Sequence, residues 1–515
     1  MRTGALGWIV SAALLQPALV ASAERDAARL EAIESFIESS LKEWKVPGLA
    51  IAIVDDGEVV LAKGFGYRNV EEKLPVTERT LFAIGSNTKS FTAAILGMLA
   101  DEKKLEWDRP VREYLPDFRL YDDAATDGMT PRDLVTHRSG LPRHDLLWYA
   151  SEFPRKELYQ RLRYLEPSKP FRSLWQYQNL MFMTAGYLEE SIVGKSWEQI
   201  VRERILDPLG MARSNFSVTS MQKSDDFSYP YGSRKEQVVR VPFRNIDEVG
   251  PAGSINSSVE EMIRYVRFHL DGGKYGEKQI LSPENSRAMQ TAQVAMPPSP
   301  IAPDYPEQGP TSYGLGLIVT NYRGHKMILH GGGIDGFISQ MAWLPDDKLG
   351  VVVLTNYSGF NPVPNLVVQH AFDRLLGLEP VDWTSRAREL KAKGDKLRAE
   401  ARTKDEAERK SGTSPSHPLS DFEGPFEHAG YGTFVVKKSG EGLEGSVTGI
   451  TFPLEHYHYD VFRVPYDLEA PLDEIGGRKA QFFYDKSGAI DRVVLPLEEA
   501  VPDIVFTRVK QDARN

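Results

Sequence analysis

A serine begins the most constrained stretch of this chain, where an apolar segment gives way to a long amphipathic one. Apolar residues follow Ser86 at helical spacing, which predicts that the serine lies at the start of a buried helix. These residues are Phe91, Ala94, Ile95, Met98 and Leu99. Lys89 comes three residues after the serine, close to one helical turn, so both side chains share one face. The pattern therefore predicts a helix that presents a hydroxyl and an amine together at its first turn.

This pair has two interpretations. A lysine that burial pushes toward neutrality can take the proton of the Ser86 hydroxyl. The N–H groups at a helix N-terminus would then favour the negative charge of an alkoxide or a tetrahedral oxyanion. Alternatively, Ser86 is a helix N-cap and Lys89 is a solvated residue of the first turn. A bare Ser-x-x-Lys is common by chance, so the rest of the chain has to decide between the two.

A second segment carries side chains suited to the same chemistry. Tyr177 and Asn179 are two residues apart, so on extended backbone both side chains point to one side. A phenol there could shuttle protons beside a lysine, and an amide could hold a substrate carbonyl or the lysine itself. The alternative is an ordinary Tyr and Asn in a turn. Upstream, Trp148, Tyr149 and Phe153 could wall a cleft, although filling a helical core is the more common role of such aromatic residues.

A glycine-rich strand supplies the third segment. Residues 326–329 predict a strand that runs into His330, Gly331, Gly332 and Gly333. Glycines in a strand let another backbone approach closely. That would suit a substrate lying along the strand, with the Gly333 N–H as a second oxyanion donor beside that of Ser86. The competing interpretations are a structural histidine and a β-bulge.

The first 23 residues are typical of an export signal. Arg2 gives a short positive region, an apolar stretch runs from about residue 6 to residue 20, and small residues at 21–23 precede charged ones. Cleavage is predicted after Ala23, and the alternative is an uncleaved membrane anchor. We therefore expect a periplasmic or secreted protein without stable membrane association after cleavage, since no other stretch could span a bilayer.

Composition divides the remainder into two domains and a linker. Residues 24–380 form the larger unit, and residues 381–419 are so highly charged that they predict a partly helical linker. Residues 420–515 contain short alternating runs separated by turn signals, which indicates a small antiparallel barrel. A charged linker suggests few contacts between the domains. We therefore expect a chain that ends near Leu378 to fold and to keep activity on a small ester.

Charge and cysteine content exclude several functions. The formal net charge is −10 without a basic block, which argues against nucleic-acid binding. The chain has no cysteine, so disulfides, thiolate metal sites and a cysteine nucleophile are excluded. His456 and His458 would share a strand face, but no third ligand is evident, so packing is favoured over a metal site. Neither a metal nor another cofactor is predicted.

Taken together, the chain resembles the penicillin-recognising serine hydrolases, specifically the class C β-lactamase-like peptidases and esterases. The resemblance covers about residues 35–380 and rests on seven motifs in the family's order. They are Ser86-x-x-Lys89, Leu134 to Pro142, Tyr177-x-Asn179, Leu206 to Met211, Pro251-Ala252-Gly253, Tyr313-Gly314-Leu315-Gly316 and His330-x-Gly332. The resemblance implies an α+β fold, an antiparallel sheet flanked by helices with a helical lobe across the cleft. The residues agree with it, because the runs at 49–54 and 58–67 around a turn signal predict a hairpin that can join the strands predicted at 326–355 in one sheet. Residues 421–432 look like the start of the lipocalin-like barrel of some relatives.

The resemblance also implies roles for single residues. Ser86 would be the nucleophile, Lys89 its base and Tyr177 the proton shuttle. Asn179 would contact the substrate and the lysine, and residues 330–333 would be the substrate-binding strand. The leading hypothesis is thus a hydrolase that cleaves an ester or peptide amide through an acyl-enzyme. Its partner would be a small-molecule ester, a peptide or a cell-wall-derived substrate, and an oligomer is possible.

Two alternatives stay open. One is a β-lactamase or a D-alanyl-D-alanine carboxypeptidase, and the other is a penicillin-binding sensor or scaffold that does not turn over. True β-lactamases of the family usually carry lysine and threonine where this chain has His330 and Gly331. A histidine has an ordinary pKa of about 6.5 and is mostly neutral near pH 7.5, so a permanent charge is missing. This predicts a preference for neutral esters or amides over anionic β-lactams.

Overall fold

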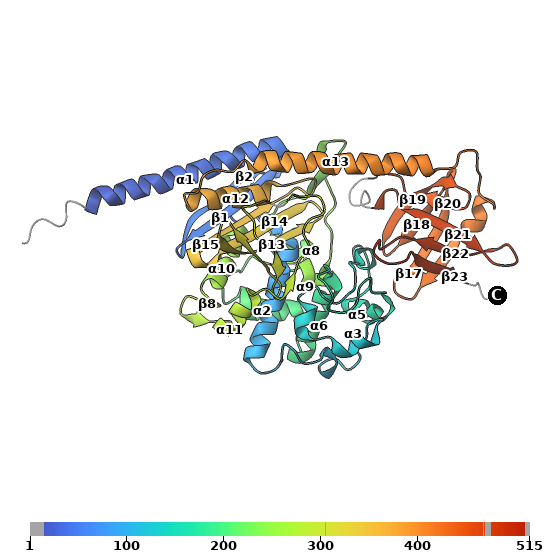
Figure 1. The fold of residues 1–515 in the computed structure, drawn as a ribbon, viewed down its shortest axis with the longest axis horizontal. Coiled ribbons are helices and arrows are strands. Elements are labelled where there is room, and N and C mark those ends of the chain that lie inside the picture. Colours follow the sequence, from blue (N-terminus) through green and yellow to red (C-terminus); the bar gives the residue numbers. More distant parts are fainter. Residues whose placement is uncertain (1–14, 304, 467, 469–474, 510–515) are drawn as a thin grey trace, which may run out of the picture.

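The computed structural model describes residues 15–303, 305–466, 468 and 475–509, and the side chains of the first helix from residue 27 onward (Figure 1). A nine-stranded antiparallel sheet forms the centre of the larger domain, in the order β10-β11-β12-β13-β14-β15-β1-β2-β3. Its strands are β1 Gly48–Asp55, β2 Glu58–Asn69, β3 Leu74–Pro75, β10 Val294–Ala295, β11 Ser312–Tyr313, β12 Ile318–Tyr322, β13 His325–Ile334, β14 Phe337–Leu344 and β15 Leu349–Thr355. The predicted hairpin and the predicted strands near residue 330 thus belong to one sheet.

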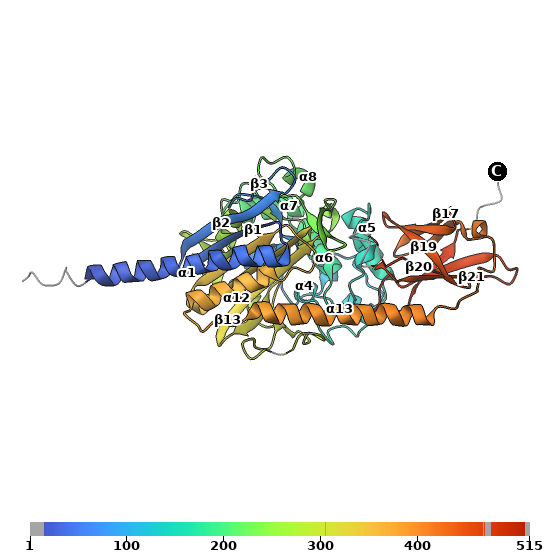
Figure 2. The ribbon, with the colours of Figure 1, turned by 90° about the horizontal axis from the view of Figure 1, so that it is seen from above.

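The side chains of strand β1 are apolar on both faces of the sheet, so both faces have to be covered. Its residues from Gly48 to Val54 are all buried, as an unbroken apolar run predicts. Alternate side chains face opposite sides. Ile51 and Ile53 join an apolar cluster with helices α1 Leu15–Trp44 and α12 Val363–Leu375. Ala50 and Ala52 face a second cluster that contains α10 Val259–Leu270 and α2 Thr88–Asp101. Figure 2 shows α1 and α12 together on the first of these faces.

The second cluster continues into a helical lobe. Helix α2 is buried along its first twelve residues and packs against α6 Asn179–Val193 and α9 Gly250–Gly253. The other helices of this region are α3 Asp123–Gly128, α4 Pro131–Leu134, α5 Arg155–Arg161, α7 Trp197–Val201, α8 Val218–Met221 and α11 Pro283–Met289. The antiparallel sheet, its flanking helices and this lobe confirm the expected α+β fold.

The C-terminal part is a closed all-β barrel, as expected for a lipocalin-like domain. Its eight strands are β16 Gly424–His428, β17 Gly432–Ser439, β18 Gly442–Val447, β19 Ile450–His458, β20 Val461–Arg463, β21 Lys479–Tyr484, β22 Ile490–Leu495 and β23 Ile504–Arg508. Inward-facing phenylalanines such as Phe434, Phe462 and Phe506 are fully buried and fill it. Helix α13 Trp383–Glu408 occupies most of the predicted linker and runs from the sheet domain to the barrel (Figure 1).

The expectation of few contacts between the two domains is wrong. The apolar cluster of the helical lobe continues without a break into the barrel. Figures 1 and 2 both place α5 beside the barrel, and the α5 residue Arg161 donates a hydrogen bond of 2.8 Å to the Gly430 carbonyl. The charge of α13 misled the sequence argument, because its charged groups are used to attach the helix at both ends. Arg386 pairs with Glu307 at 2.9 Å at the end near the sheet, and Asp405 pairs with Arg463 at 2.8 Å at the barrel end.

Residues 1–14, most of the predicted export signal, lie outside the described residues, and cleavage after Ala23 stays a prediction. Among the described helices, none combines the length and the apolar character that crossing a membrane requires. Within the same part of the chain, no group of three or more histidine and carboxylate side chains is arranged to hold a metal ion.

Candidate active site

Ser86 lies in a single 3₁₀ turn, Gly85–Asn87, that leads directly into α2. The preceding short strand, β4 Phe82–Ala83, pairs with β7 Asn256–Ser257 and fixes the entry to this turn. Gly85 has a positive φ of 52°, and a Cβ there would lie 2.7 Å from the Gly333 nitrogen. Only glycine therefore allows the Ser86 turn to approach β13 this closely. Ser86 itself is half-buried and lines a cleft.

Lys89 is fully buried, and its amine is placed to act as a base. Burial lowers the pKa of Lys89 well below its ordinary value, and the charge of Arg143 lowers it further, whereas Asp145 opposes both. The nitrogen lies 2.7 Å from both Asn179 Oδ1 and the Ala252 carbonyl oxygen. An uncharged amine has two hydrogens, and these two acceptors take both. Its lone pair then faces the Ser86 hydroxyl, 3.0 Å away.

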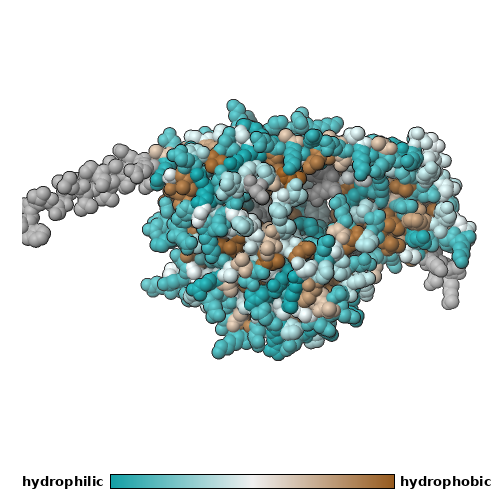
Figure 3. All heavy atoms as spheres, viewed as in Figure 1, coloured by the Kyte–Doolittle hydropathy of each residue, from teal (hydrophilic) through white to brown (hydrophobic). Residues whose placement is uncertain are grey.

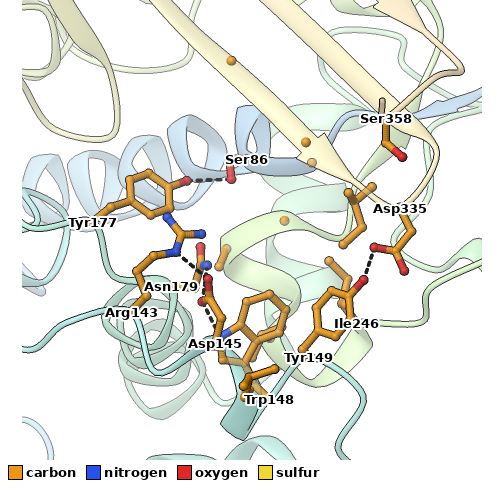
Figure 4. Close-up of a pocket in the computed structure, with 18 of the residues that line it drawn as sticks. Ser86, Arg143, Asp145, Trp148, Tyr149, Tyr177, Asn179, Ile246, Asp335 and Ser358 are labelled. Atoms are coloured by element: carbon orange, nitrogen blue, oxygen red, sulfur yellow. Dashed lines mark hydrogen bonds and ion pairs between the residues drawn. The ribbon is translucent and has the colours of Figure 1, made fainter. Parts of the chain in front are cut away.

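Tyr177 approaches Ser86 from the other side. Its hydroxyl lies 2.6 Å from Ser86 Oγ, and burial raises the pKa of Tyr177 to about 12. The phenol is therefore neutral and can donate to the serine oxygen. Tyr177 and Asn179 point to the same side because Gln178 between them is extended, at φ −145° and ψ 114°. The structure thus brings together the predicted nucleophile, base and shuttle around one oxygen. Figure 4 shows the contact between Ser86 and Tyr177.

The glycine-rich segment is divided between two functions. Gly331 and Gly333 line the cleft, as expected of a substrate-binding strand. Gly332 does not: a Cβ at this position would collide with the Ile84 carbonyl oxygen. Gly332 thus allows close packing of β13 on the turn that holds Ser86. Its contact with substrate stays a prediction.

His330 also lines the cleft, although it is 3% exposed. Its Nδ1 lies 2.6 Å from the Gly331 carbonyl oxygen, and Nε2 lies 3.0 Å from the Tyr313 hydroxyl. Only an Nδ1–H can bond to a carbonyl, so Nε2 accepts from the tyrosine. Burial lowers the pKa of His330 to about 3. The side chain is therefore neutral near pH 7.

The structure adds site residues that sequence reasoning missed, in the loop after residue 142. Arg143 lies over the Tyr177 ring, 4.8 Å from its centre, and donates a 2.5 Å hydrogen bond to Asp145. Asp145 in turn accepts from Asn179 Nδ2 at 3.0 Å and from Trp148 Nε1 at 2.9 Å. Figure 4 shows this loop beside Ser86. No sequence pattern marked Arg143 or Asp145, because the loop gains its position from tertiary contacts.

The far wall of the cleft contains a second ion pair. Asp335, just after β13, accepts a hydrogen bond from the Tyr149 hydroxyl and pairs with Arg244 at 3.0 Å. Tyr149 comes from the helical lobe and Asp335 from the sheet, so this contact joins the two sides of the cleft (Figure 4). Trp148 and Tyr149 therefore wall the cleft, the interpretation that sequence reasoning ranked second. Phe153 does not line it and instead packs under Arg161, 3.8 Å from the centre of its ring.

The cleft has a volume of about 810 Å³ and is bounded by both domains. The barrel contributes six lining residues, Ile450, Ile475, Arg478, Leu497, Glu498 and Glu499. In Figure 3 the molecular surface is hollowed between the sheet domain and the barrel. The barrel is thus a wall of the candidate site, and the sequence alone did not place it there.

Known proteins resemble this chain over both domains. Residues 33–373 match the Beta-lactamase family, and residues 408–508 match a family described as a domain of unknown function, DUF3471. An unguisins hydrolase of Aspergillus campestris is 30% identical over 419 residues, which cover 78% of this chain and 76% of the relative.

Solved structures of other proteins also resemble this chain. The octameric penicillin-binding protein homologue from Pyrococcus abyssi has a TM-score of 0.58 and 27% identity, covering 93% of this chain and 100% of that one. A D-amino acid amidase from Ochrobactrum anthropi, with a TM-score of 0.55, 21% identity and coverage of 67% and 99%, shares the fold. The chain therefore belongs to the beta-lactamase family of serine hydrolases.

Proposed function

We propose that the protein hydrolyses a neutral ester or peptide amide through an acyl-enzyme on Ser86. One observation carries this proposal: the Ser86 oxygen lies 3.0 Å from the Lys89 amine and 2.6 Å from the Tyr177 hydroxyl, at the wall of a large cleft. A nucleophile within hydrogen-bond reach of an oriented base is the arrangement that acyl transfer requires. The hydrolase relative supports the same reaction class.

The geometry supports the following course of acylation. Lys89 Nζ takes the proton of Ser86 as Oγ attacks the carbonyl carbon, and the negative charge moves to the carbonyl oxygen. When the tetrahedral intermediate collapses, the bond to the leaving nitrogen or oxygen breaks. Tyr177 donates its proton to the leaving group, and the proton that Lys89 took from Ser86 then restores the neutral phenol. A buried phenol that stays protonated is suited to this exchange.

Deacylation runs through the same groups. A water molecule attacks the acyl carbon and gives its proton to Lys89, directly or through Tyr177. The bond from the acyl carbon to Ser86 Oγ then breaks, and the serine oxygen recovers the proton. Lys89 can repeat this cycle because its two N–H groups stay bonded to Asn179 and Ala252, which leaves its lone pair directed at the reaction centre.

The charges in the cleft support a neutral acyl group. His330 is uncharged, and the guanidinium of Arg143 is already paired with Asp145. Neither supplies a free cation for the carboxylate of a penicillin or of a D-alanyl peptide, and the lining residue Arg478 lies 3.7 Å from the carboxylate of Glu499. The aromatic side chains of Trp148, Tyr149 and Trp175 line the cleft and suit an apolar substituent. We also propose that the protein is exported, on the basis of the signal pattern at residues 1–23.

Intact-mass spectrometry tests the proposal. The enzyme is mixed with a panel of neutral p-nitrophenyl esters, D-amino-acid p-nitroanilides and penicillins, and both the adduct mass and product release are followed. We expect a transient acyl adduct with ester or anilide turnover, which Ser86→Ala abolishes. Ser220→Ala, at an exposed serine of α8, is the matched control. Turnover that survives in Ser86→Ala would refute the proposal. A permanent adduct without product release would identify a sensor instead.

A further inference from the structure

One buried histidine connects the barrel to the active-site loop. His144 lies between Arg143 and Asp145 and is fully buried. Its backbone N–H donates to Glu498 Oε2 at 2.8 Å, and its Nδ1 lies 2.8 Å from the Tyr431 hydroxyl. Both partners belong to the barrel. The residue is thus attached to the second domain through its backbone and through its ring.

The hydrogen bonds define how the ring is used. His144 Nε2 lies 3.3 Å from the Glu166 carbonyl oxygen, which can only accept. The ring therefore carries its hydrogen on Nε2, and Nδ1 accepts the hydrogen of the Tyr431 hydroxyl. Tyr431 is itself fully buried, so its hydroxyl would lose this partner if the barrel moved away.

His144 also has an unusual backbone. Its φ is +47°, in the left-handed region that side chains other than glycine rarely adopt. Such a conformation persists only when the surroundings determine it. Here, the barrel supplies two of those determining contacts, those of Tyr431 and Glu498. The direction in which the chain enters and leaves residue 144 therefore depends on the barrel.

A continuous series of contacts leads from this residue to the nucleophile. Asp145 Oδ1 accepts from Asn179 Nδ2 at 3.0 Å, and Asn179 Oδ1 accepts from Lys89 at 2.7 Å. Lys89 is 3.0 Å from Ser86 Oγ. On the other side of His144, Arg143 lies over the ring of Tyr177. Displacement of His144 would thus change both the base and the shuttle.

The barrel holds the following residues of the loop as well. Thr448 Oγ1 donates to the Leu146 carbonyl at 2.6 Å. Gly449 approaches the Ala150 carbonyl so closely that a Cβ would collide with it. Thr448 and Gly449 lie in the turn between β18 and β19, whereas Tyr431 lies between β16 and β17 and Glu498 lies between β22 and β23. The whole loop from 144 to 150 is therefore shaped on the barrel surface.

We propose that Tyr431 and Glu498 of the barrel are positioning residues of the hydrolase. By fixing His144 they set the Arg143–Asp145 pair, and through Asn179 they orient the Lys89 amine toward Ser86. The barrel is then a part of the catalytic unit. This inference rests on the proposed function, since it assigns a role in the Ser86 reaction.

Tyr431→Phe is the decisive variant, because Tyr431 is buried away from the cleft and cannot act by contacting substrate. The substitution removes one hydroxyl and preserves the ring. We expect kcat for a neutral ester to fall about ten-fold or more, because small misplacements of catalytic groups cost up to about 10² in rate. KM should change by less than about two-fold, because the cleft wall is intact. Tyr484→Phe, at an exposed barrel tyrosine, should leave both constants unchanged.

A pair of substitutions at Glu498 separates positioning from simple stability. Glu498→Gln retains an acceptor for the His144 N–H, whereas Glu498→Leu removes it. We expect the glutamine variant to keep kcat within about three-fold of the wild-type value. The leucine variant should lower kcat as much as Tyr431→Phe does. Glu427→Gln, at an exposed barrel glutamate, is the control. Thermal melting shows the folded fraction, to which each kcat is normalised.

The outcomes are separable from failure of the proposed function. Wild-type enzyme without any Ser86-dependent turnover would refute the function itself. Wild-type turnover with normal kcat in both Tyr431→Phe and Glu498→Leu would overturn the positioning role. Equal losses in Glu498→Leu and Glu498→Gln would overturn it too, because the effect would then not depend on an acceptor for His144.

Discussion

Replacing Arg143 with glutamine should move the acidic limb of the pH–rate profile to higher pH. Lys89 acts as a base only when it is uncharged, so kcat/KM rises with pH through the pKa of Lys89. Arg143 lowers that pKa and Asp145 raises it. Removing the guanidinium ends one repulsion and leaves the carboxylate unpaired, and both changes raise the pKa of Lys89. The rise in activity therefore occurs at a higher pH.

Geometry bounds the size of this shift. The Arg143 guanidinium and the Lys89 amine each lie 4.8 Å from the centre of the Tyr177 ring, so the two are at most about 9.6 Å apart. At that distance and an effective dielectric of about 20, the repulsion is about 1.7 kcal/mol. The Arg143 side chain is 52% exposed, and doubling the dielectric for solvent screening gives about 0.9 kcal/mol. Because this separation is the largest that the two distances allow, the expected shift is at least about 0.6 to 1.3 pH units.

The assay is kcat/KM for a neutral ester measured across pH at fixed ionic strength, with the uncatalysed rate subtracted. Asp145→Asn should shift the acidic limb of the profile in the opposite direction, to lower pH. It removes the charge that raises the pKa of Lys89 but keeps an oxygen that accepts from Asn179. Arg112→Gln, in an exposed ion pair with Asp127, is the control and should not move it. An unmoved limb in both site variants, or shifts of the same sign, would refute the electrostatic reasoning.

Three further changes have defined outcomes. Ser86→Ala should lower kcat by a factor of about 10⁴ to 10⁶. Tyr177→Phe should lower kcat by a factor of only about 10² to 10⁴, because water can partly replace a proton shuttle. Single-turnover kinetics distinguishes the two variants. We expected from sequence that a chain ending after Leu378 would stay active. Because it lacks the barrel contacts, it should instead lose most of its turnover, and its melting temperature should fall. Wild-type kcat in this truncated chain would show that the barrel is dispensable. Gly332→Ala should lower both the melting temperature and kcat, because its Cβ would collide with backbone at the Ser86 turn. Gly394→Ala in α13 should raise stability slightly, because a Cβ there would make only an ordinary contact with the Arg398 side chain at 3.9 Å.

The sequence was sufficient where function depends on local geometry. Ser86 and Lys89 share a helix face because they are three residues apart, and Tyr177 and Asn179 share a side because Gln178 is extended. Neither relation needs the rest of the fold. The alternating and unbroken apolar runs also predicted the strands around β1 and β13 correctly, since burial on one or both faces leaves a direct pattern in the chain.

The rest of the site depends on contacts between distant segments. Asp145 gains its role from a hydrogen bond with Asn179. His144 gains its backbone conformation from Tyr431, which follows it by nearly three hundred positions, and from Glu498, which follows it by more. No spacing rule connects such residues. The packing of Gly332 could not be predicted for a related reason. A glycine in a strand indicates a close approach, but the sequence does not say that the Ser86 turn is the approaching group.

A helical connection between two domains constrains how the chain can vary in length. Helix α13 has 26 residues, so at about 1.5 Å per residue it spans about 39 Å as a stiff spacer. Inserting one residue would translate the barrel by about 1.5 Å and rotate it by about 100° around the helix axis. A flexible connection would absorb such a change, but this one transmits it to the surface that receives His144. Viable relatives should therefore keep the length of α13 nearly constant and confine insertions to the solvent-facing hairpin turns of the barrel.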